Sequence, residues 1–181
     1  PKKDISDKGV KFRNELNGEE SELTPERSIN IQNSLGADII MAFDECTPYP
    51  ASEKDAFRGV RRTLSWLERS LKAHQRPNEQ SLFGIVQGST FPRLRRLCAE
   101  GVKTFDLPGY AIGGVSVGEG HDLLCKITKE TAPLLPEAKP RYLMGVGLPE
   151  DILASVGFGI DLFDCVIPTR YARSASVFTR R

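Results

Sequence analysis

The sequence has few of the residues that build metal sites and disulfide frameworks. Its 181 residues include four cysteines and two histidines. No two cysteines have the C-x-x-C spacing typical of zinc sites, so we expect no metal site within this chain. Cys98 and Cys125 lie on the apolar faces of predicted helices, which favours reduced thiols and a cytoplasmic protein over disulfides. His74 and His121 fall in polar, helix-like segments, so histidine-based catalysis is disfavoured.

A strong net charge and long apolar runs are absent too. Lys and Arg total 25 against 24 Asp and Glu, so bulk charge does not indicate a nucleic-acid partner, and any RNA contact must come from local clusters. No apolar run reaches about 18 residues, so no membrane-spanning helix is expected. The chain begins at Pro1 without an initiator Met or the apolar core of a signal peptide, so we expect a processed or incomplete chain. Its length suits one domain, residues 1–181.

What the sequence does contain is a regular alternation of apolar strands and amphipathic helices. We predict a small hairpin from 10–14 and 21–23, and then a helix capped by Thr24, with Pro25 in its first turn and its end at Gly36. Further strands are predicted at 37–43, 81–86, 109–112, 140–144 and 160–163, and further helices at 53–74, 91–101, 121–134 and 149–157. Near-continuous apolar strands alternating with helices indicate a parallel sheet.

Polar groups and glycines follow each predicted strand. These strand-end residues are Asp44, Gln87, Gly113, Gly114, Gly145 and Asp164. In a parallel barrel such ends converge on one face, where active sites form. An open doubly wound sheet would use one crevice and a glycine-rich first turn, of which Gly145-Val146-Gly147 matches only a fragment. We therefore predict an α/β fold of the (βα)8 TIM-barrel type, with about five of the eight βα units in this chain.

Two acids near the last strand allow two interpretations. A carboxylate in so apolar a run is costly to bury without a partner or a task. Either Asp161 caps a turn and Asp164 accepts backbone hydrogen bonds, or Asp164 is a reactive carboxylate at the mouth of the barrel. A carboxylate can attack the anomeric carbon of a sugar and form a covalent glycosyl intermediate. Asp44 and Gln87 can read the edge of a planar heterocycle such as a purine. These residues predict a barrel enzyme with carboxylate chemistry and leave its substrate open.

Five ordered motifs resemble a known family. They are FDECTPYPA at 43–51, FGIVQG at 83–88, GYAIGG at 109–114, RYLMGVG at 141–147 and DLFDC at 161–165. Together they resemble the bacterial tRNA-guanine transglycosylases, over nearly the whole chain. That family exchanges the wobble guanine of certain tRNAs for a 7-deazaguanine base on the route to queuosine. The resemblance implies a TIM barrel, tRNA and a 7-deazaguanine base as partners, and a homodimer.

The resemblance also implies roles for individual residues. Asp164 is the nucleophile that takes the ribose. The base is held and surrounded by Asp44, Gln87, Gly114, Gly113, Cys46, Tyr110 and Met144. RNA is contacted by Gly145, Val146, Gly147, Leu148, Pro149, Glu150 and Asp151, and by Thr169, Arg170, Tyr171, Ala172 and Arg173. Cys46 and Val117 resemble the bacterial form, which favours 7-aminomethyl-7-deazaguanine over queuine as the incoming base.

The chain departs from the family pattern in ways that bear on activity. The family's general acid/base aspartate lies in an upstream segment that these residues lack. Its structural zinc ligands, a C-x-C-x-x-C and a later His, lie downstream of Arg181, so no zinc ligand is expected here. The usual R-N-G reads Arg173-Ser174-Ala175. We expect this polypeptide alone to be weakly active or inactive. The alternatives are a non-catalytic base- and tRNA-binding chain that needs a partner, and a barrel lyase or hydrolase, which the strand-end residues disfavour.

Overall fold

A computed structural model describes residues 4–179 and begins with a small antiparallel sheet. Its strands are β1 (Asp4–Ile5), β2 (Val10–Arg13) and β3 (Glu20–Leu23), and the helix α1 (Pro25–Leu35) follows. The Thr24 side chain accepts a hydrogen bond from the Arg27 amide at 3.2 Å, and Gly36 ends the helix with φ of 74°. The predicted hairpin and helix limits are confirmed. Strand β1 was not predicted, because two residues are too few to show alternation.

The main sheet is parallel and keeps its strands in chain order. The strands are β4 (Ile39–Met41), β5 (Ser81–Val86), β6 (Gly109–Ile112), β7 (Arg141–Leu143) and β8 (Leu162–Phe163). The connecting helices are α2 (Glu53–Ala73), α3 (Pro92–Lys103), α4 (His121–Thr131) with the short η1 (Ala132–Leu134), and α5 (Pro149–Gly157). The edge strands β4 and β8 are shorter than predicted, because each pairs with a neighbour on one side only.

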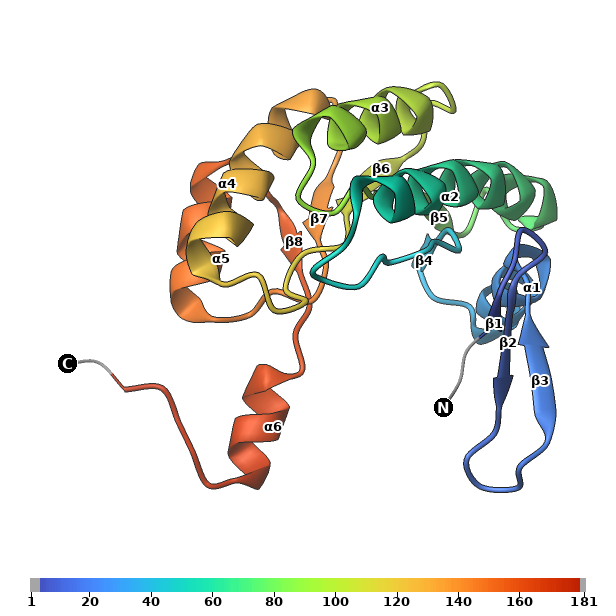
Figure 1. Cartoon of the computed structure of the whole chain (residues 1–181), viewed down its shortest axis with the longest axis horizontal. Coiled ribbons are helices and arrows are strands. Elements are labelled where there is room, and N and C mark those ends of the chain that lie inside the picture. Colours follow the sequence, from blue (N-terminus) through green and yellow to red (C-terminus); the bar gives the residue numbers. More distant parts are fainter. Residues whose placement is uncertain (1–3, 180–181) are drawn as a thin grey trace.

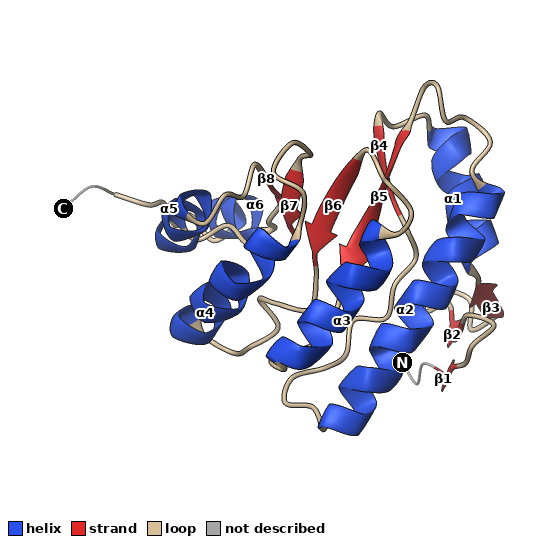
Figure 2. Ribbon diagram, turned by 90° about the horizontal axis from the view of Figure 1, so that it is seen from above, coloured by secondary structure: helices blue, strands red, loops and turns tan. Residues whose placement is uncertain are grey.

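The sheet is a partial barrel and not an open doubly wound sheet. Its order β4-β5-β6-β7-β8 never reverses, whereas a doubly wound sheet reverses at its switch point and has helices on both faces. Here the sheet is curled, and α2 to α5 cover its convex side (Figures 1 and 2). The predicted TIM-type fold, with five of its strands in this chain, is confirmed.

The core lies between the sheet and these helices. A Cβ added to Gly84 would lie 2.6 Å from side-chain atoms of Leu107 and Val102, so Gly84 faces the helix layer. Tyr110 pairs in register with Gly84 and shares that face; its side chain is buried in the core. Successive strand residues point to opposite faces, so the neighbours of Gly84 along β5 face the concave side of the sheet. On the concave side Ile39 is 43% exposed, so this face is less well covered than the convex face under the helices.

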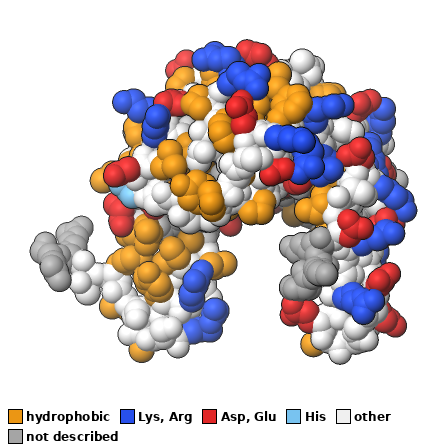
Figure 3. Space-filling view, in the orientation of Figure 1, with side chains coloured by type: hydrophobic (Ala, Val, Ile, Leu, Met, Phe, Trp, Pro, Cys, Tyr) orange, Lys and Arg blue, Asp and Glu red, His pale blue; other side chains and the backbone are white. Residues whose placement is uncertain are grey.

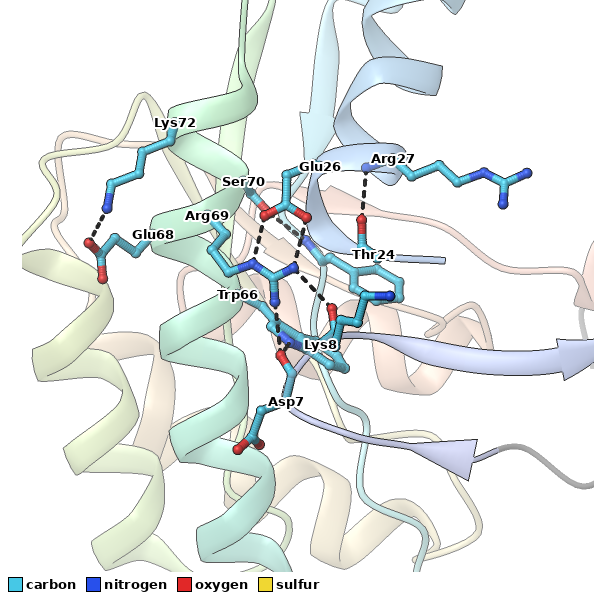
Figure 4. Close-up of polar contacts among 11 residues, drawn as sticks. Asp7, Lys8, Thr24, Glu26, Arg27, Trp66, Glu68, Arg69, Ser70 and Lys72 are labelled. Carbon is cyan, nitrogen blue, oxygen red and sulfur yellow. Dashed lines mark hydrogen bonds and ion pairs between the residues drawn. The ribbon is translucent and has the colours of Figure 1, made fainter. Parts of the chain in front are cut away.

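The hairpin is fixed to α2 by a cluster of hydrogen bonds around Arg69 (Figure 4). Its guanidinium donates to both carboxylate oxygens of Glu26, at 2.6 and 2.8 Å, and to the carbonyls of Asp7 and Lys8. The Trp66 indole donates to the same Asp7 carbonyl at 2.9 Å. The basic side chain of Arg69 is therefore used inside the molecule, where it joins two elements that are distant in sequence.

Two segments, called arms here, extend from the concave side of the curled sheet. One is the hairpin, and the other is α6 (Ile167–Arg173), which leads to the C-terminal end of the described chain (Figures 1 and 3). Helix α6 was not predicted, because its seven residues are too few to show a helical apolar period, and none of them is buried. Within residues 4–179, no helix is long and apolar enough to cross a membrane.

Candidate active site at the strand ends

The ends of β4 and β5 bring two of the predicted base-binding residues into contact. The Gln87 amide donates to Asp44 Oδ2 at 2.6 Å. Gln87 is 1% exposed, and its Oε1 is buried with no hydrogen-bond partner among the described residues. Burial raises the pKa of Asp44 above its ordinary value, and the hydrogen bond from Gln87 opposes this. A buried acceptor without a partner is costly, so this corner is suited to a ligand that supplies donors.

The loop after β6 lies directly against Gln87. A Cβ on Gly113 would come within 2.6 Å of the Gln87 amide nitrogen, and one on Gly114 would overlap the amide oxygen. Gly114 also has φ of 65°, which L side chains rarely adopt. Glycine is therefore required twice, and the main chain of this loop forms a wall beside the amide.

Arg95 holds the two loops together from behind. This α3 side chain is 2% exposed and donates to four carbonyls, those of Ser89 (2.8 Å), Val86 (3.0 Å), Gly113 (2.6 Å) and Gly114 (3.0 Å). It forms no ion pair with any described carboxylate. Burial lowers its pKa to about 10, so it stays charged at neutral pH. Its carbonyl contacts span the loops after β5 and β6, so Arg95 sets the position of one loop relative to the other.

The sequence contains a local signal that Arg95 is buried. Arg95, Cys98 and Val102 are spaced three and four residues apart, so the arginine lies on the buried face of α3. A buried arginine needs acceptors, but the sequence does not say which ones.

Asp164, after β8, is held by two donors and open on its other side. Its Oδ1 accepts from the Tyr142 hydroxyl at 2.6 Å and from the Gly145 amide at 2.7 Å. Oδ2 accepts no hydrogen bond from the described residues, and the side chain is exposed. Burial, and then the hydrogen bond to Asp164, raise the pKa of Tyr142, so its hydroxyl remains a donor. The role of Tyr142 was missed, although Tyr142 lies two residues before Met144 and so on the same strand face.

Asp161 has a purely structural contact. Its Oδ2 accepts from the Arg141 amide at 2.8 Å, which ties the start of β8 to the start of β7. The two acids therefore differ in surroundings: the carboxylate of Asp161 aligns two strand starts, and Asp164 presents a free oxygen at the strand ends.

Of the three other predicted pocket residues, Cys46 and Met144 lie at the strand ends and Tyr110 does not. Partial burial, and then the charge of Asp44, raise the pKa of the Cys46 thiol, while Arg95 and the Gly114 amide oppose this. Met144 follows β7 and is half-buried. Tyr110 was expected to line the pocket, and the structure corrects this: its side chain faces the helices, and its hydroxyl accepts from the Leu107 amide at 3.1 Å. The alternation of β6 turns it away from the face that carries Gly113.

The predicted RNA-contacting segments are divided between exposed and buried side chains. Arg170 and Arg173 are exposed on α6. The side chains of Val146, 1% exposed, and Asp151, 6% exposed, are turned inward, and the RNA contacts expected of both segments stay predictions. Val146 belongs to the hydrophobic core, and Asp151 accepts a hydrogen bond from His121.

A hollow of about 380 Å³ reaches the site from the hairpin side. It is lined by Phe12 and Leu23 of the hairpin, by Trp66 of α2, and by Asp44 and Cys46. The hairpin therefore forms one wall of the approach to Asp44. The C-x-C-x-x-C and histidine set implied for a structural zinc does not occur among the 181 residues.

Comparison with known proteins places the chain in a family. The queuine tRNA-ribosyltransferase family matches residues 1–181. Among curated proteins, a queuine tRNA-ribosyltransferase of Cyanothece is 57% identical over 97% of this chain and 46% of its own length. The Anoxybacillus flavithermus protein of the same name is 55% identical over the same shares, and that of Listeria monocytogenes is 53% identical over 98% and 47%.

These relatives are longer than the chain, which spans about half of their length. The match nevertheless covers the whole described sheet, both strand-end loops and α6. The chain belongs to the queuine tRNA-ribosyltransferase family.

Proposed function

We propose that this chain carries the nucleophile and the base pocket of a tRNA-guanine transglycosylase, a pentosyltransferase. The observation that supports this most directly is the environment of Asp164. Two donors fix its Oδ1 and leave Oδ2 free. Asp164 follows a strand of the same sheet whose other strands end at the hydrogen-bonded pair Asp44 and Gln87. Membership of the queuine tRNA-ribosyltransferase family supports the same reaction class.

The base pocket fits the hydrogen-bond donors of guanine. The Asp44 carboxylate and the buried Gln87 oxygen are acceptors, and guanine offers an imino hydrogen and an exocyclic amino group. The glycine wall at Gly113 and Gly114 lets a planar base approach the main chain closely. A 7-deazaguanine base has the same donor edge, so one pocket accepts the departing and the incoming base. We assign 7-aminomethyl-7-deazaguanine as the incoming base.

The exchange proceeds through two displacements at the ribose. Asp164 Oδ2 attacks C1′ of the wobble guanosine, the C1′–N9 bond breaks, and guanine leaves with that electron pair and takes up a proton. The incoming base then gives up a proton, attacks C1′ with its ring nitrogen, and releases the Asp164 carboxylate. Configuration at C1′ is retained, and no net proton is consumed. Tyr142 and the Gly145 amide orient the carboxylate and stabilise its charge when it leaves.

Contacts to the tRNA come from the two exposed segments. Arg170 and Arg173 of α6 suit phosphate groups, and the loop that starts at Gly145 lies beside Asp164. We further propose that the complete enzyme is a homodimer, as the family resemblance implies. We also propose a cytoplasmic location for it, since tRNA is its substrate.

A covalent adduct tests the reaction. The chain is incubated with a tRNA carrying a wobble guanine, and the products are separated under denaturing conditions. We expect a slowly formed protein–tRNA adduct that Asp164→Asn abolishes. Asp161→Asn is the matched control: its carboxylate contacts only a strand-start amide, and the asparagine oxygen can still accept that bond. An adduct that persists in Asp164→Asn would contradict the assignment of the nucleophile.

A second candidate is a base- and tRNA-binding chain without catalysis. It is favoured by one observation, that the chain spans about half the length of its relatives. This alternative predicts that the base binds, with affinity reduced by Gln87→Ala, and that no adduct forms with the unmodified chain. Calorimetric titration with 7-aminomethyl-7-deazaguanine, beside the adduct assay, separates the two functions.

A further inference from the structure

Three side chains able to bind metal meet at the beginnings of α4 and α5. His121 is the first residue of α4, and Cys125 lies one turn later on the same side of the helix. Asp151 comes from the first turn of α5, which lies beside α4 (Figure 1). One ligand atom from each residue lies within 4.8 Å of the others. The group joins elements 30 residues apart in sequence, so C-x-x-C spacing could not reveal it.

The spacing of these atoms is close to that of a bound transition metal. His121 Nδ1 lies 2.5 Å from Asp151 Oδ1 and 3.8 Å from Cys125 Sγ. Around a tetrahedral zinc ion, with bonds of about 2.0–2.3 Å, a nitrogen and a sulfur ligand lie about 3.5 Å apart and a nitrogen and an oxygen about 3.3 Å apart. The ion would replace the proton between His121 and Asp151, and the pair would separate by less than about 1 Å.

Burial and exposure are distributed as in an open metal site. The Asp151 side chain is 8% exposed and is held in the first turn of α5, while the His121 side chain is 49% exposed and free to adjust. A solvent molecule can therefore reach the fourth position. The ligand types also select the ion, because a thiolate with an imidazole and one carboxylate suits zinc, whereas calcium and magnesium prefer oxygen ligands alone.

We propose that His121, Cys125 and Asp151 form a binding site for a zinc-class divalent ion. This site differs from the zinc ligand set implied by the family resemblance and does not depend on the proposed function. Binding releases the thiol proton of Cys125 to solvent, and His121 binds through Nδ1 as the neutral imidazole, with its remaining hydrogen on Nε2. The ion links α4 to α5, and thereby the loop that carries Gly114 to the loop that carries Gly145.

Cobalt is a suitable probe, because a cobalt–thiolate bond absorbs in the near ultraviolet. The reduced, chelator-treated chain is titrated with Co²⁺, and Zn²⁺ is then added. We expect one equivalent of Co²⁺ with a thiolate band, displaced by Zn²⁺. Cys125→Ser should remove the band, and His121→Ala and Asp151→Asn should each weaken binding at least about 10-fold, because even outer partners of metal ligands have effects of 10–100-fold.

Matched controls separate this site from other thiols and from misfolding. Cys46→Ser and Cys165→Ser should keep the band, since neither residue belongs to the cluster. His121→Cys should restore the affinity lost in His121→Ala, with a second thiolate contribution, which a misfolded variant would not do. The proposal is overturned if no thiolate band forms, if the band survives Cys125→Ser, or if it disappears in Cys46→Ser or Cys165→Ser.

Discussion

At the scale of single residues, the candidate site depends on a few side chains whose partners lie in other elements. Asp44 and Gln87 are 43 residues apart and share a hydrogen bond of 2.6 Å. Behind them, the single guanidinium of Arg95 supports four carbonyls. Such a buried charge is tolerated because the guanidinium nitrogens donate to carbonyl acceptors. Removing the guanidinium therefore leaves several main-chain carbonyls without a donor.

Replacing Arg95 should therefore affect both stability and base binding. We expect Arg95→Met to lower the free energy of unfolding by about 3 kcal/mol, because buried carbonyls lose their donors. Arg95→Lys should be milder in stability, yet should still weaken base binding, since one ammonium cannot reach both loops. Urea unfolding and calorimetric titration with 7-aminomethyl-7-deazaguanine measure the two effects. The exposed neighbour Arg96→Lys is the control and should change stability by less than about 0.5 kcal/mol. Unaltered base affinity in Arg95→Lys would argue against a positioning role.

At the scale of elements, the hairpin is attached to the barrel by polar contacts on α2. The hydrogen bond from Arg69 is the main reason that the pKa of Glu26 falls from 4.5 to about 2. Glu26 belongs to α1 and Arg69 to α2, and the same guanidinium holds the turn before β2 through Asp7 and Lys8. One ion pair thus joins three segments, although the Glu26 side chain is 44% exposed and solvent screens part of its effect.

This pair should make stability depend on acidity. The folded-state pKa of Glu26 is lower than its ordinary value, so its contribution is complete above about pH 4.5 and is lost as the pH falls towards about 2. We expect Glu26→Gln to be less stable than the unmodified chain at pH 6, with the difference vanishing near pH 2. Urea unfolding across this range measures it. Glu68→Gln, which removes an exposed pair with Lys72 on the same helix, should have a smaller effect. A difference for Glu26→Gln that stays constant across the range would exclude this linkage.

At the scale of the whole molecule, the chain is a curled sheet with helices on its convex side and two arms on its concave side (Figure 1). The strand ends place Asp44, Gln87, Gly114 and Asp164 on one rim, but the concave face is only partly covered, as Ile39 shows. The resemblance places the proton-transfer aspartate in a segment that these residues lack.

The 181-residue chain should therefore exchange guanine slowly or not at all. In the proposed mechanism Asp164 acts without the acid/base aspartate that the family resemblance places in another segment, and such a group typically contributes about 10²–10⁴-fold. Incorporation of labelled guanine into tRNA, compared with a relative of full length, measures this. Exchange by the chain at the rate of the longer protein would show that its own residues supply the proton transfer.

The sequence by itself determined most of the secondary structure and the candidate chemistry, because these depend on local patterns. Apolar spacing predicted α2 and β5, turn residues limited α1, and the residues after each strand indicated Asp44, Gln87 and Asp164. Motif resemblance then implied the family. The pocket role that the resemblance implied for Tyr110 was wrong, because the alternation of β6 turns this side chain towards the helices.

Only the tertiary structure decided which side chains meet. The carbonyl contacts of Arg95, the hydrogen bond from Tyr142 to Asp164, and the meeting of His121, Cys125 and Asp151 all join elements that are separate in sequence. Sheet register and helix packing create these contacts. The physical reason is that the sequence shows which buried or charged groups need a partner. The identity of that partner depends on the order of the strands and the placement of the helices.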